Sequence, residues 1–377
     1  MWSRSRGPSP QLQRDPSTGP TLFITRKFPP AVGGMETLAS NVWEALRTVE
    51  PDALLIAHGG SVARTPLWLP GAAVRLAVLT VRRRVGAVLC GDVLLYGLVG
   101  PILRLTGVPH AVMAMGLDVT YDNALYRRTI LPGLRRAPRV LAISSATADA
   151  VRGAGVDPDR IEIIAMGLPD PGVDRADAEA ARSRLHAELG LDPEVPIVVT
   201  VGRLVPRKGV AWFVSEVVPQ LHGDVHYVVA GDGPDAEAIE SAVQRLGLAS
   251  RVHLLGRVSD ERRSLLMSGA DLFVQPNVPV AGDMEGFGLV AIEAAMHGTV
   301  VLASELEGLR DAVEDSVTGR LIPAEDAARW ASEVTGLLED RAALADTAER
   351  FRDACVERSS LGVMQEQLVV AMGIETG

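Results

Sequence analysis

The amino-acid sequence predicts an α/β protein of two domains, each with a parallel sheet covered by helices. The chain has 377 residues, more than one ordinary core needs, and its 47% hydrophobic and 22% charged residues are typical of a globular protein. Short apolar runs alternate with longer helical patterns, which is the pattern of parallel sheets covered on both faces. A polar, proline-bounded segment within residues 168–195 interrupts this alternation, so we place the domain boundary there.

The expected strands are short apolar runs, each followed by a helical or loop segment. In the first half they lie at 21–25, 53–58, 86–91, 110–115, 140–144 and 161–167. In the second half they lie at 197–202, 226–233, 251–256, 271–276 and 299–304. Ligands of doubly wound sheets bind at the carboxyl ends of the strands, so two such domains facing one another would hold a ligand in the cleft between them.

The domain assignment follows from these runs. We expect a disordered tail over residues 1–20, a first domain over 21–170, a linker over 171–195, a second domain over 196–355, and a C-terminal helix over 356–377 that could cross back to the first domain. The tail is polar and lacks an apolar run, so it does not have the pattern of a secretory signal. The most apolar stretch, residues 85–105, is interrupted by Gly91-Asp92 and predicts a strand and a helix rather than a membrane span.

The composition of the chain argues against a disulfide framework, a metal site and nucleic-acid binding. Cys90 and Cys355 are the only cysteines, which implies no disulfide framework and favours the reducing cytoplasm. No cluster of histidine, cysteine and aspartate has the spacing of a metal site. The net charge of −10 and the 4% aromatic content argue against nucleic-acid binding. The charge is also uneven, because residues 1–170 carry 19 basic and 13 acidic side chains whereas residues 171–377 carry 18 and 34.

The segment EGFGLVAIE holds Glu285 and Glu293. If residues 286–288 form a turn and a helix starts near Leu289, Glu285 precedes the helix N-terminus and Glu293 lies one turn inside it. Backbone N–H groups at that terminus would then point at an anion or at a ligand rich in hydroxyls. The alternative is a surface glutamate followed by an ordinary amphipathic helix.

The segment VGRLVPRKG follows a predicted strand and places Arg203 and Lys208 in one loop, beside Gly202. Two cations and a close backbone suit a diphosphate, although a solvated basic loop would have the same composition. The chain has 35 arginines and only two lysines, Lys27 and Lys208. A compact ammonium in a chain that otherwise uses arginine favours a point contact to phosphate.

Three further segments carry weaker signals. Gly33-Gly34 would let backbone amides approach a phosphate or a sugar, but a plain tight turn is the alternative. Residues 231–236 match a dinucleotide-binding pattern, yet the next strand ends at Arg257 without an acid for a ribose, so a simple strand–turn–helix is expected. Asp157 and Asp159 mimic a metal motif, but the intervening proline indicates a loop or a helix cap.

In their order and spacing these motifs resemble the retaining glycosyltransferases with the GT-B fold, often called family four, over residues 20–345. The resemblance rests on the loop at 33–34 and on AISSATADAV, PDRIEIIAMG, VGRLVPRKG, VVAGDGP, HLLGRV, EGFGLVAIEAAMHGTVVLAS and GLRDAVEDSVTGRLIP. It implies two Rossmann-like domains facing one another across a ligand cleft. It also implies a nucleoside diphosphate sugar as donor, a hydroxyl acceptor, and no cofactor or metal.

The resemblance assigns roles to single residues. Arg203 and Lys208 would hold the donor diphosphate, Glu285 would bind hydroxyls of the donor sugar without acting as a nucleophile, and Glu293 would bind the ribose. Because cations on the leaving diphosphate are the largest expected contribution, we assign catalysis to Arg203, Lys208 and Glu285. The remaining donor contacts are expected from glycine turns and backbone groups, at Gly33, Gly34, Gly202, Gly256, Arg257, Val258, Gly286, Phe287, Gly288 and Leu289.

Two positions depart from the family pattern. Met115-Gly116 stands where members often have His-Gly, and Met166-Gly167 stands where they often have Asn-Gly. Methionine has no proton to share, and His110 lies too early, at the start of the strand, to replace the histidine. Asp118 is the nearest acid, so Met115, Gly116 and Asp118 are the expected residues on the acceptor side.

Three functions fit these observations. The first is a retaining transferase acting on a glycolipid, a polysaccharide or a small-molecule acceptor. The second is a phosphorylase or sugar-nucleotide epimerase with the same fold. The third is a degenerate partner subunit that binds nucleotide without turnover; Met115 favours it, and the retained cations and glutamates of the second domain argue against it.

The basic first half suggests an anionic acceptor, or peripheral contact with an anionic membrane at its inner face. Arg82-Arg83-Arg84 adjoin the apolar run LAVLTV. Ordinary solvated helices are the alternative. A second basic segment holds Arg127, Arg128, Arg135, Arg136 and Arg139, with Ile130, Leu131 and Leu134 facing either a bilayer or the core.

Overall fold

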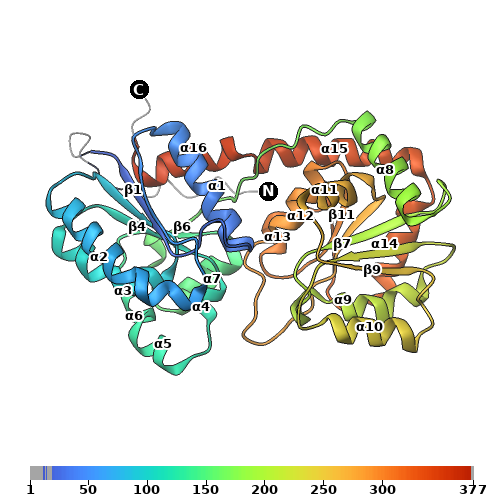
Figure 1. Cartoon of the computed structure of the whole chain (residues 1–377), viewed down its shortest axis with the longest axis horizontal. Helices are drawn as coiled ribbons and strands as arrows, with labels where there is room; N and C mark the ends of the chain where they lie inside the picture. Colours follow the sequence, from blue (N-terminus) through green and yellow to red (C-terminus); the bar gives the residue numbers. More distant parts are fainter. Residues whose placement is uncertain (1–11, 13, 15–18, 375–377) are drawn as a thin grey trace. The chain divides into compact units, whose positions relative to one another are not determined.

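The computed structural model describes Leu12, Arg14 and residues 19–374. Most of the expected disordered tail, residues 1–20, therefore lies outside the described residues. The chain divides into two compact units (Figure 1). Unit 1 comprises the described residues up to Pro169 together with those from Ser360, and unit 2 comprises Asp170–Ser359.

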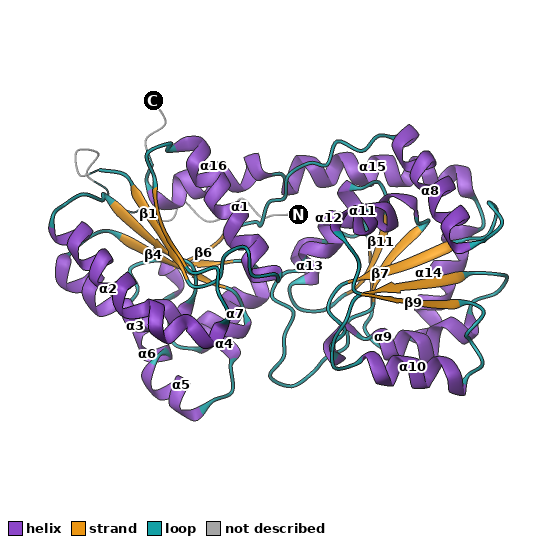
Figure 2. Cartoon of the chain, in the orientation of Figure 1, coloured by secondary structure: helices purple, strands orange, loops and turns teal. Residues whose placement is uncertain are grey.

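Unit 1 contains a six-stranded sheet in which all neighbouring strands are parallel. Its strands are β1 (Thr21–Thr25), β2 (Leu54–Ala57), β3 (Ala87–Cys90), β4 (His110–Ala114), β5 (Val140–Ala142) and β6 (Ile161–Ile163), in the order β2-β1-β3-β4-β5-β6. Its helices are α1 (Gly34–Val49), α2 (Thr65–Val81), α3 (Val93–Thr106), α4 (Leu117–Thr120), α5 (Ala124–Thr129), α6 (Leu131–Leu134), α7 (Ser145–Gly153) and α16 (Leu361–Met372). The strands that were read as apolar runs lie between helices (Figure 2), which explains why they lack a polar face.

Unit 2 repeats the scheme with a second parallel six-stranded sheet. Its strands are β7 (Ile197–Val201), β8 (His226–Ala230), β9 (Val252–Gly256), β10 (Leu272–Gln275), β11 (Val300–Ser304) and β12 (Arg320–Ile322), in the order β12-β11-β10-β7-β8-β9. Its helices are α8 (Arg175–Leu189), α9 (Val210–Trp212), α10 (Ala236–Arg245), α11 (Asp260–Gly269), α12 (Leu289–Met296), α13 (Leu309–Ala312), α14 (Ala327–Leu338) and α15 (Arg341–Ser359). The predicted α/β class with two parallel sheets is confirmed.

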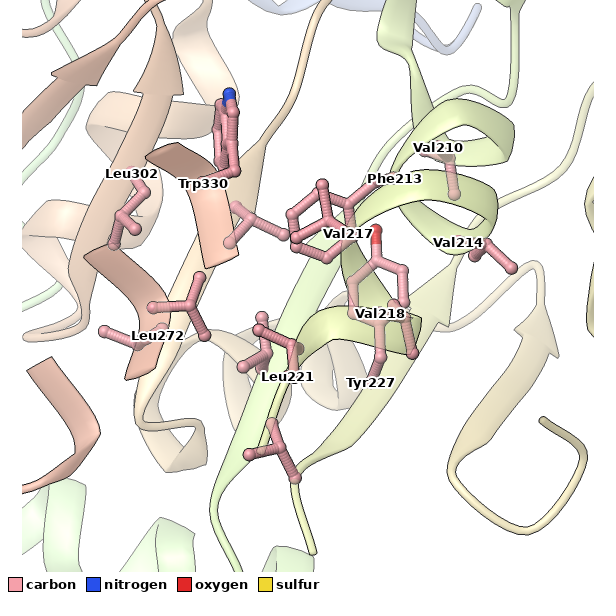
Figure 3. Packing of buried hydrophobic residues seen from close by; sticks show 14 of the residues in the cluster. Val210, Phe213, Val214, Val217, Val218, Leu221, Tyr227, Leu272, Leu302 and Trp330 are labelled. Carbon is pink, nitrogen blue, oxygen red and sulfur yellow. The ribbon is translucent and has the colours of Figure 1, made fainter. Parts of the chain in front are cut away.

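The core of unit 2 is packed around three aromatic rings (Figure 3). The ring centre of Phe213 lies 5.0 Å from that of Tyr227 and 5.7 Å from that of Trp330. The Thr200 hydroxyl donates to the Val274 carbonyl at 2.6 Å, so the Tyr227 hydroxyl donates to Thr200 at 2.7 Å. These bonds join the Tyr227 side chain of β8 to β7 and β10 near the carboxyl ends of those two strands, which gives the loops after β7 and β10 a rigid base.

Three segments differ from the sequence expectation. Residues 171–195, expected as a linker, carry α8, which begins with a capping box between Asp174 and Asp177 and packs on α11 within unit 2. The strand β12 was not expected, because it has only three residues and starts with an arginine. The expected C-terminal helix over 356–377 is broken at Ser360, since α15 ends at Ser359 and α16 packs on α1 in unit 1.

The second basic segment of unit 1 is less exposed than the sequence suggested. Ile130 and Leu134 belong to the core, so these two side chains do not face a bilayer. Arg139 is buried as well, and it pairs with Glu162 at 3.0 Å. Among the described residues no helix is both long enough and apolar enough to cross a bilayer. Cys90 and Cys355 are buried free thiols.

Candidate active site

Most of the predicted donor residues lie at the carboxyl edge of the sheet in unit 2. Arg203 and Lys208 follow β7, residues 256–258 end and follow β9, and Glu285 lies in the loop between β10 and α12. β10 and β7 are neighbours in the sheet. Loops that follow neighbouring parallel strands meet at one edge, so residues far apart in the sequence come together there.

The centre of the site is an ion pair between Lys208 and Glu285. The distance from Lys208 Nζ to Glu285 Oε2 is 2.5 Å, and both side chains are largely buried. The Asn277 amide donates to the same oxygen at 3.1 Å. Burial alone would raise the pKa of Glu285, but the charges of Lys208 and Arg207 and the hydrogen bonds from Lys208 and Asn277 hold it below its ordinary value. Glu285 is therefore an anion at neutral pH, held by groups that ligand atoms could also engage.

Arg207 extends this network, and the sequence reading missed it. Its Nη1 lies 3.0 Å from Asp283 Oδ1, and its Nε lies 3.7 Å from Glu285 Oε2. The Val278 N–H donates to the Arg207 carbonyl at 2.9 Å, so the loops after β7 and β10 are also joined through the backbone. A second cation next to Lys208 was visible in the sequence as Arg207-Lys208. Its pairing with Asp283 requires the fold.

A third loop, after β11, holds Glu285 by its backbone. The Glu285 N–H donates to Glu307 Oε2 at 2.5 Å, and the Gly308 N–H donates to the Glu285 carbonyl at 3.2 Å. A Cβ at Gly308 would lie 2.3 Å from the Gly286 carbonyl oxygen, so the approach needs a glycine there. Glu307 has a φ of 47°, which is unusual for a residue with a side chain. Burial raises the pKa of Glu307, and the neighbouring Glu285 and Asp283 charges act in the same direction.

The turn of EGFG ends at Gly288, and α12 begins at Leu289, as the sequence predicts. Gly288 has a φ of 100°, and a Cβ there would lie 2.5 Å from Leu309, so glycine is required at this position. Phe287 is buried and anchors the turn, whereas Gly286 is half-buried. The turn leaves Glu285 just before the first N–H groups of the helix.

Glu293 lies one turn inside α12 and pairs with Arg263 of α11. Burial raises the pKa of Glu293 above its ordinary value, although Arg263 and His297 oppose this. The side chain is half-buried. A hydroxyl ligand could therefore share this carboxylate with Arg263.

The rest of the predicted donor side is more open. Arg203 is exposed and, in the part of the chain that the structure describes, has no ion-pair partner. Gly256 and Arg257 are exposed and Val258 is half-buried, and Gly256 has a φ of 62°. The Gly202 N–H donates to the Ala230 carbonyl at 2.9 Å, which fixes the start of the Arg203 loop. These residues follow β7 and β9 on the same edge of the sheet as the Lys208–Glu285 pair.

In unit 1 the predicted residues follow β1 and β4. Gly33 precedes α1, and a Cβ there would lie 2.5 Å from Glu36, which pairs with Lys27 at 3.0 Å. Gly34 is exposed, with open space where a Cβ would be. The charge of Lys27 is therefore already paired with a carboxylate of the helix that follows its loop.

Asp118 has both carboxylate oxygens occupied by backbone donors. Oδ2 accepts from Val93 N–H at 3.0 Å and Oδ1 accepts from Met115 N–H at 2.8 Å. Burial raises the pKa of Asp118 to about 7, with Asp92 adding to the shift and the backbone bonds opposing it. Met115 is buried, and Gly116 has a φ of 90° in the turn before α4. Asp118 thus ties the start of α3 to the end of β4.

The segments set aside in the sequence behave as expected. Residues 231–236 join β8 to α10, and the Leu204 N–H donates to the Asp232 carbonyl at 3.0 Å. Asp157 accepts from the Asp159 N–H at 3.1 Å and caps a short helical turn. His110 is buried at the start of β4 and bonds the Val108 carbonyl and the Tyr96 hydroxyl. No group of three or more metal-ligating side chains is found within the described residues.

Known proteins resemble the chain in sequence and in fold. Residues 195–340, which include most of the described site, match the family model of glycosyl transferases group 1. The chain is 28% identical over 390 residues to the alpha-maltose-1-phosphate synthase of Mycolicibacterium smegmatis, an alignment that covers 92% of this chain and 96% of that protein. It is 36% identical over 197 residues to a D-inositol 3-phosphate glycosyltransferase of Nocardia farcinica, where it spans 42% of that protein and 50% of itself.

Among solved structures, the fold is similar to that of HepE from Anabaena in complex with UDP and glucose. The TM-score is 0.76 with 19% sequence identity, and the match covers 94% of this chain and 99% of HepE. At this identity the likeness concerns the fold.

Proposed function

Because the chain belongs to the group 1 glycosyltransferases and has the GT-B fold, we propose that it moves a sugar, with retention, from a nucleoside diphosphate sugar to an acceptor hydroxyl. The observation that carries this proposal is the buried Lys208–Glu285 pair at the carboxyl edge of unit 2. A cation and an anion held next to each other suit a donor that has a diphosphate beside a polyhydroxylated ring. The UDP and glucose bound to HepE support a ligand of this class.

The roles of the residues follow from the charge that develops during transfer. As the bond between the anomeric carbon and the diphosphate breaks, negative charge grows on the leaving phosphate oxygens. Lys208 and the exposed Arg203 would stabilise that charge, and the N–H groups at the start of α12 would add to it. Glu285 would hold sugar hydroxyls and favour the positive charge on the ring. Retention then requires the acceptor to attack on the face that the diphosphate leaves, and Glu285 is not assigned as a nucleophile.

The reaction is proposed to need no divalent metal and no cofactor. Lys208, Arg203 and the α12 N-terminus offset the diphosphate charge that a metal would otherwise balance. Activity should therefore persist in EDTA. Loss of turnover in EDTA that is restored by magnesium or manganese would contradict this part of the proposal.

The acceptor is proposed to meet unit 1 in the cytoplasm, with peripheral contact at an anionic inner membrane face. The buried free thiols fit a reducing compartment. The excess of basic residues in the first half of the chain fits an anionic acceptor or surface. A polysaccharide or a small molecule would serve the same reaction.

Two measurements test the proposal. Thermal unfolding with UDP, GDP, ADP or dTDP should show one nucleotide that raises the melting temperature, because a ligand at 100 times its Kd adds about 2.7 kcal/mol. A panel of sugars on that nucleotide should then show donor hydrolysis, and transfer products should keep the anomeric configuration by NMR. Binding without any turnover would favour a degenerate partner subunit, which Met115 suggests. No response to any nucleotide would overturn the proposal.

A further inference from the structure

The outward face of α2 is apolar, on the side opposite to its core contacts. Ala72, Leu76 and Thr80 are buried against unit 1. At about 100° per residue, the positions of Leu67, Val74, Val78 and Val81 fall within about 60° of arc on the other side of the helix. Their exposed fractions are 83%, 64%, 43% and 69%. A surface helix normally places polar residues there, so this stripe is not explained by folding.

The neighbouring helix continues the stripe. α3 packs against α2 (Figure 1) and exposes Leu98 and Leu105, at 45% and 88%. Exposed hydrophobic residues therefore occur on two helices that pack together, whereas isolated ones would be ordinary. We call this set the α2–α3 surface and define it by Leu67, Val74, Val78, Val81, Leu98 and Leu105.

Arginines border this surface and carboxylates are absent from it. Arg64, Arg75 and Arg82 lie along one flank of the α2 stripe, since their helical positions are about 60–80° from that of Leu67. Arg83 and Arg84 follow directly, and within the described residues none of the five arginines has an ion-pair partner. Over residues 53–117 the sequence has one acidic residue, Asp92, which is fully buried and bonded to Arg26. The surface is thus apolar at its centre and positive at its edge.

We infer that the α2–α3 surface docks on an anionic lipid bilayer, with α2 lying in the plane of the headgroups. An interfacial helix needs an apolar face that enters the acyl boundary and basic residues that meet anionic headgroups, and the surface has both. A second copy of this chain is a poorer occupant, because a symmetric contact would bring two sets of unpaired arginines together. The inference rests on the membrane contact proposed above, which it assigns to this surface, and it does not depend on the transfer reaction.

Vesicle flotation at low salt tests the inference, because screening is weakest there. The wild-type chain should float with vesicles of phosphatidylcholine and phosphatidylglycerol, stay unbound with phosphatidylcholine alone, and dissociate as salt is added. Replacing Arg82, Arg83 and Arg84 by glutamine should weaken binding roughly 100-fold. The matched control, R245Q/R329Q/R341Q, changes the charge by the same amount on exposed arginines of unit 2 and should bind as the wild type.

A second pair of variants tests the apolar part. V74S/V78S should lower binding about 10-fold while keeping its salt dependence, because it removes buried area and no charge. L246S/V370S, which changes two exposed hydrophobic residues elsewhere, should have no effect. All of these positions are exposed, so the variants should keep the wild-type melting temperature.

Several results would overturn the inference. One is a wild-type chain that does not float with anionic vesicles at low salt. Another is a control variant that loses as much vesicle binding as the test variant to which it is matched. A third is a V74S/V78S variant that changes the oligomeric state by light scattering but not flotation, because a second copy would then be the occupant. Nucleotide binding, followed by thermal shift, should be normal in every variant, so a failure here leaves the proposed reaction untouched.

Discussion

The two units share one sheet architecture and use its carboxyl edge differently, as the chain's two lysines illustrate. Lys27 follows β1, the first strand of unit 1, and pairs with Glu36 only a few residues along the chain. Lys208 follows β7, the first strand of unit 2, and pairs with Glu285 of a distant loop. The first pair stabilises one loop against its own helix. The second joins loops after two neighbouring strands, at the place where we propose that the donor binds.

The same contrast holds for the carboxylates. Asp118 in unit 1 accepts hydrogen bonds from backbone N–H groups through both oxygens. It could bind a ligand through Oδ2 only if its hydrogen bond to the start of α3 were broken. Glu285 in unit 2 is bonded through its carboxylate to side chains, which can move toward a ligand without unfolding a helix. Backbone partners indicate a structural role and side-chain partners a binding role. The first type should affect stability, and the second should affect turnover.

The largest expected effect is on catalysis. Lys208→Ala should raise the activation free energy by about 2–4 kcal/mol and so lower kcat, because it removes the charge that we propose stabilises the leaving diphosphate. The matched control is Lys27→Ala, which removes the only other lysine and should change kcat little. Steady-state kinetics with the identified donor measures both. An equal loss of kcat in the two variants would contradict the proposed difference between the two lysines.

Asp118→Ala should lower the stability of the fold, whereas Lys208→Ala should lower turnover. Loss of the carboxylate leaves two buried N–H groups, of Val93 and Met115, without their acceptor, which should cost about 2–3 kcal/mol in the free energy of unfolding. Nucleotide affinity of the folded protein should be normal. Urea denaturation and thermal shift check the two halves of this prediction. Normal stability with lost turnover would instead place Asp118 in the reaction.

The two carboxylates should also give opposite pH dependences of stability. The folded pKa of Asp118 is raised from 3.8 to about 7, so its stabilising contribution is complete at low pH and is lost as the pH rises toward 7. The folded pKa of Glu285 is lowered from 4.5, so its contribution is present at neutral pH and is lost as the pH falls below that value. Relative to Asp118→Asn, the wild type should therefore lose about 2–3 kcal/mol between pH 5 and pH 8. Relative to Glu285→Gln, it should lose stability on acidification, as unfolding curves at each pH would show.

The smallest expected effect concerns Glu307, which contacts the backbone of Glu285. Glu307→Ala should lower kcat about 10-fold, because the Glu285 N–H loses its acceptor and the loop loosens. Glu307→Gln keeps a carbonyl oxygen at that place and should restore most of the rate. If alanine and glutamine lower kcat equally, the negative charge and not the hydrogen bond is what matters.

Much of the fold could be predicted because the strands of both sheets are continuous apolar runs buried on both faces. β12 could not be predicted, because a three-residue edge strand that begins with Arg320 has no such apolar run. Within the site, Lys208 and Glu285 could be singled out from composition, spacing and family resemblance. Asp283 and Glu307 could not, because their partners come from other loops and only the folded chain brings them together. Asp118 was singled out for its chemistry, but its bond to Val93, well before it in the sequence, is not visible in any local pattern.

The return of the chain to unit 1 after Ser359 has a consequence for synthesis on the ribosome. Unit 2 is a continuous stretch, so it can finish folding as soon as its last residue leaves the exit tunnel. Unit 1 is translated first but lacks α16, which packs on α1, until all of unit 2 has been made. The earlier part is therefore completed last, and until α16 has been made the side of α1 that packs on it lacks this cover. For the same reason unit 2 can be excised as one stretch, whereas unit 1 needs its two stretches to be joined near Leu168 and Ser360, which form an isolated β-bridge.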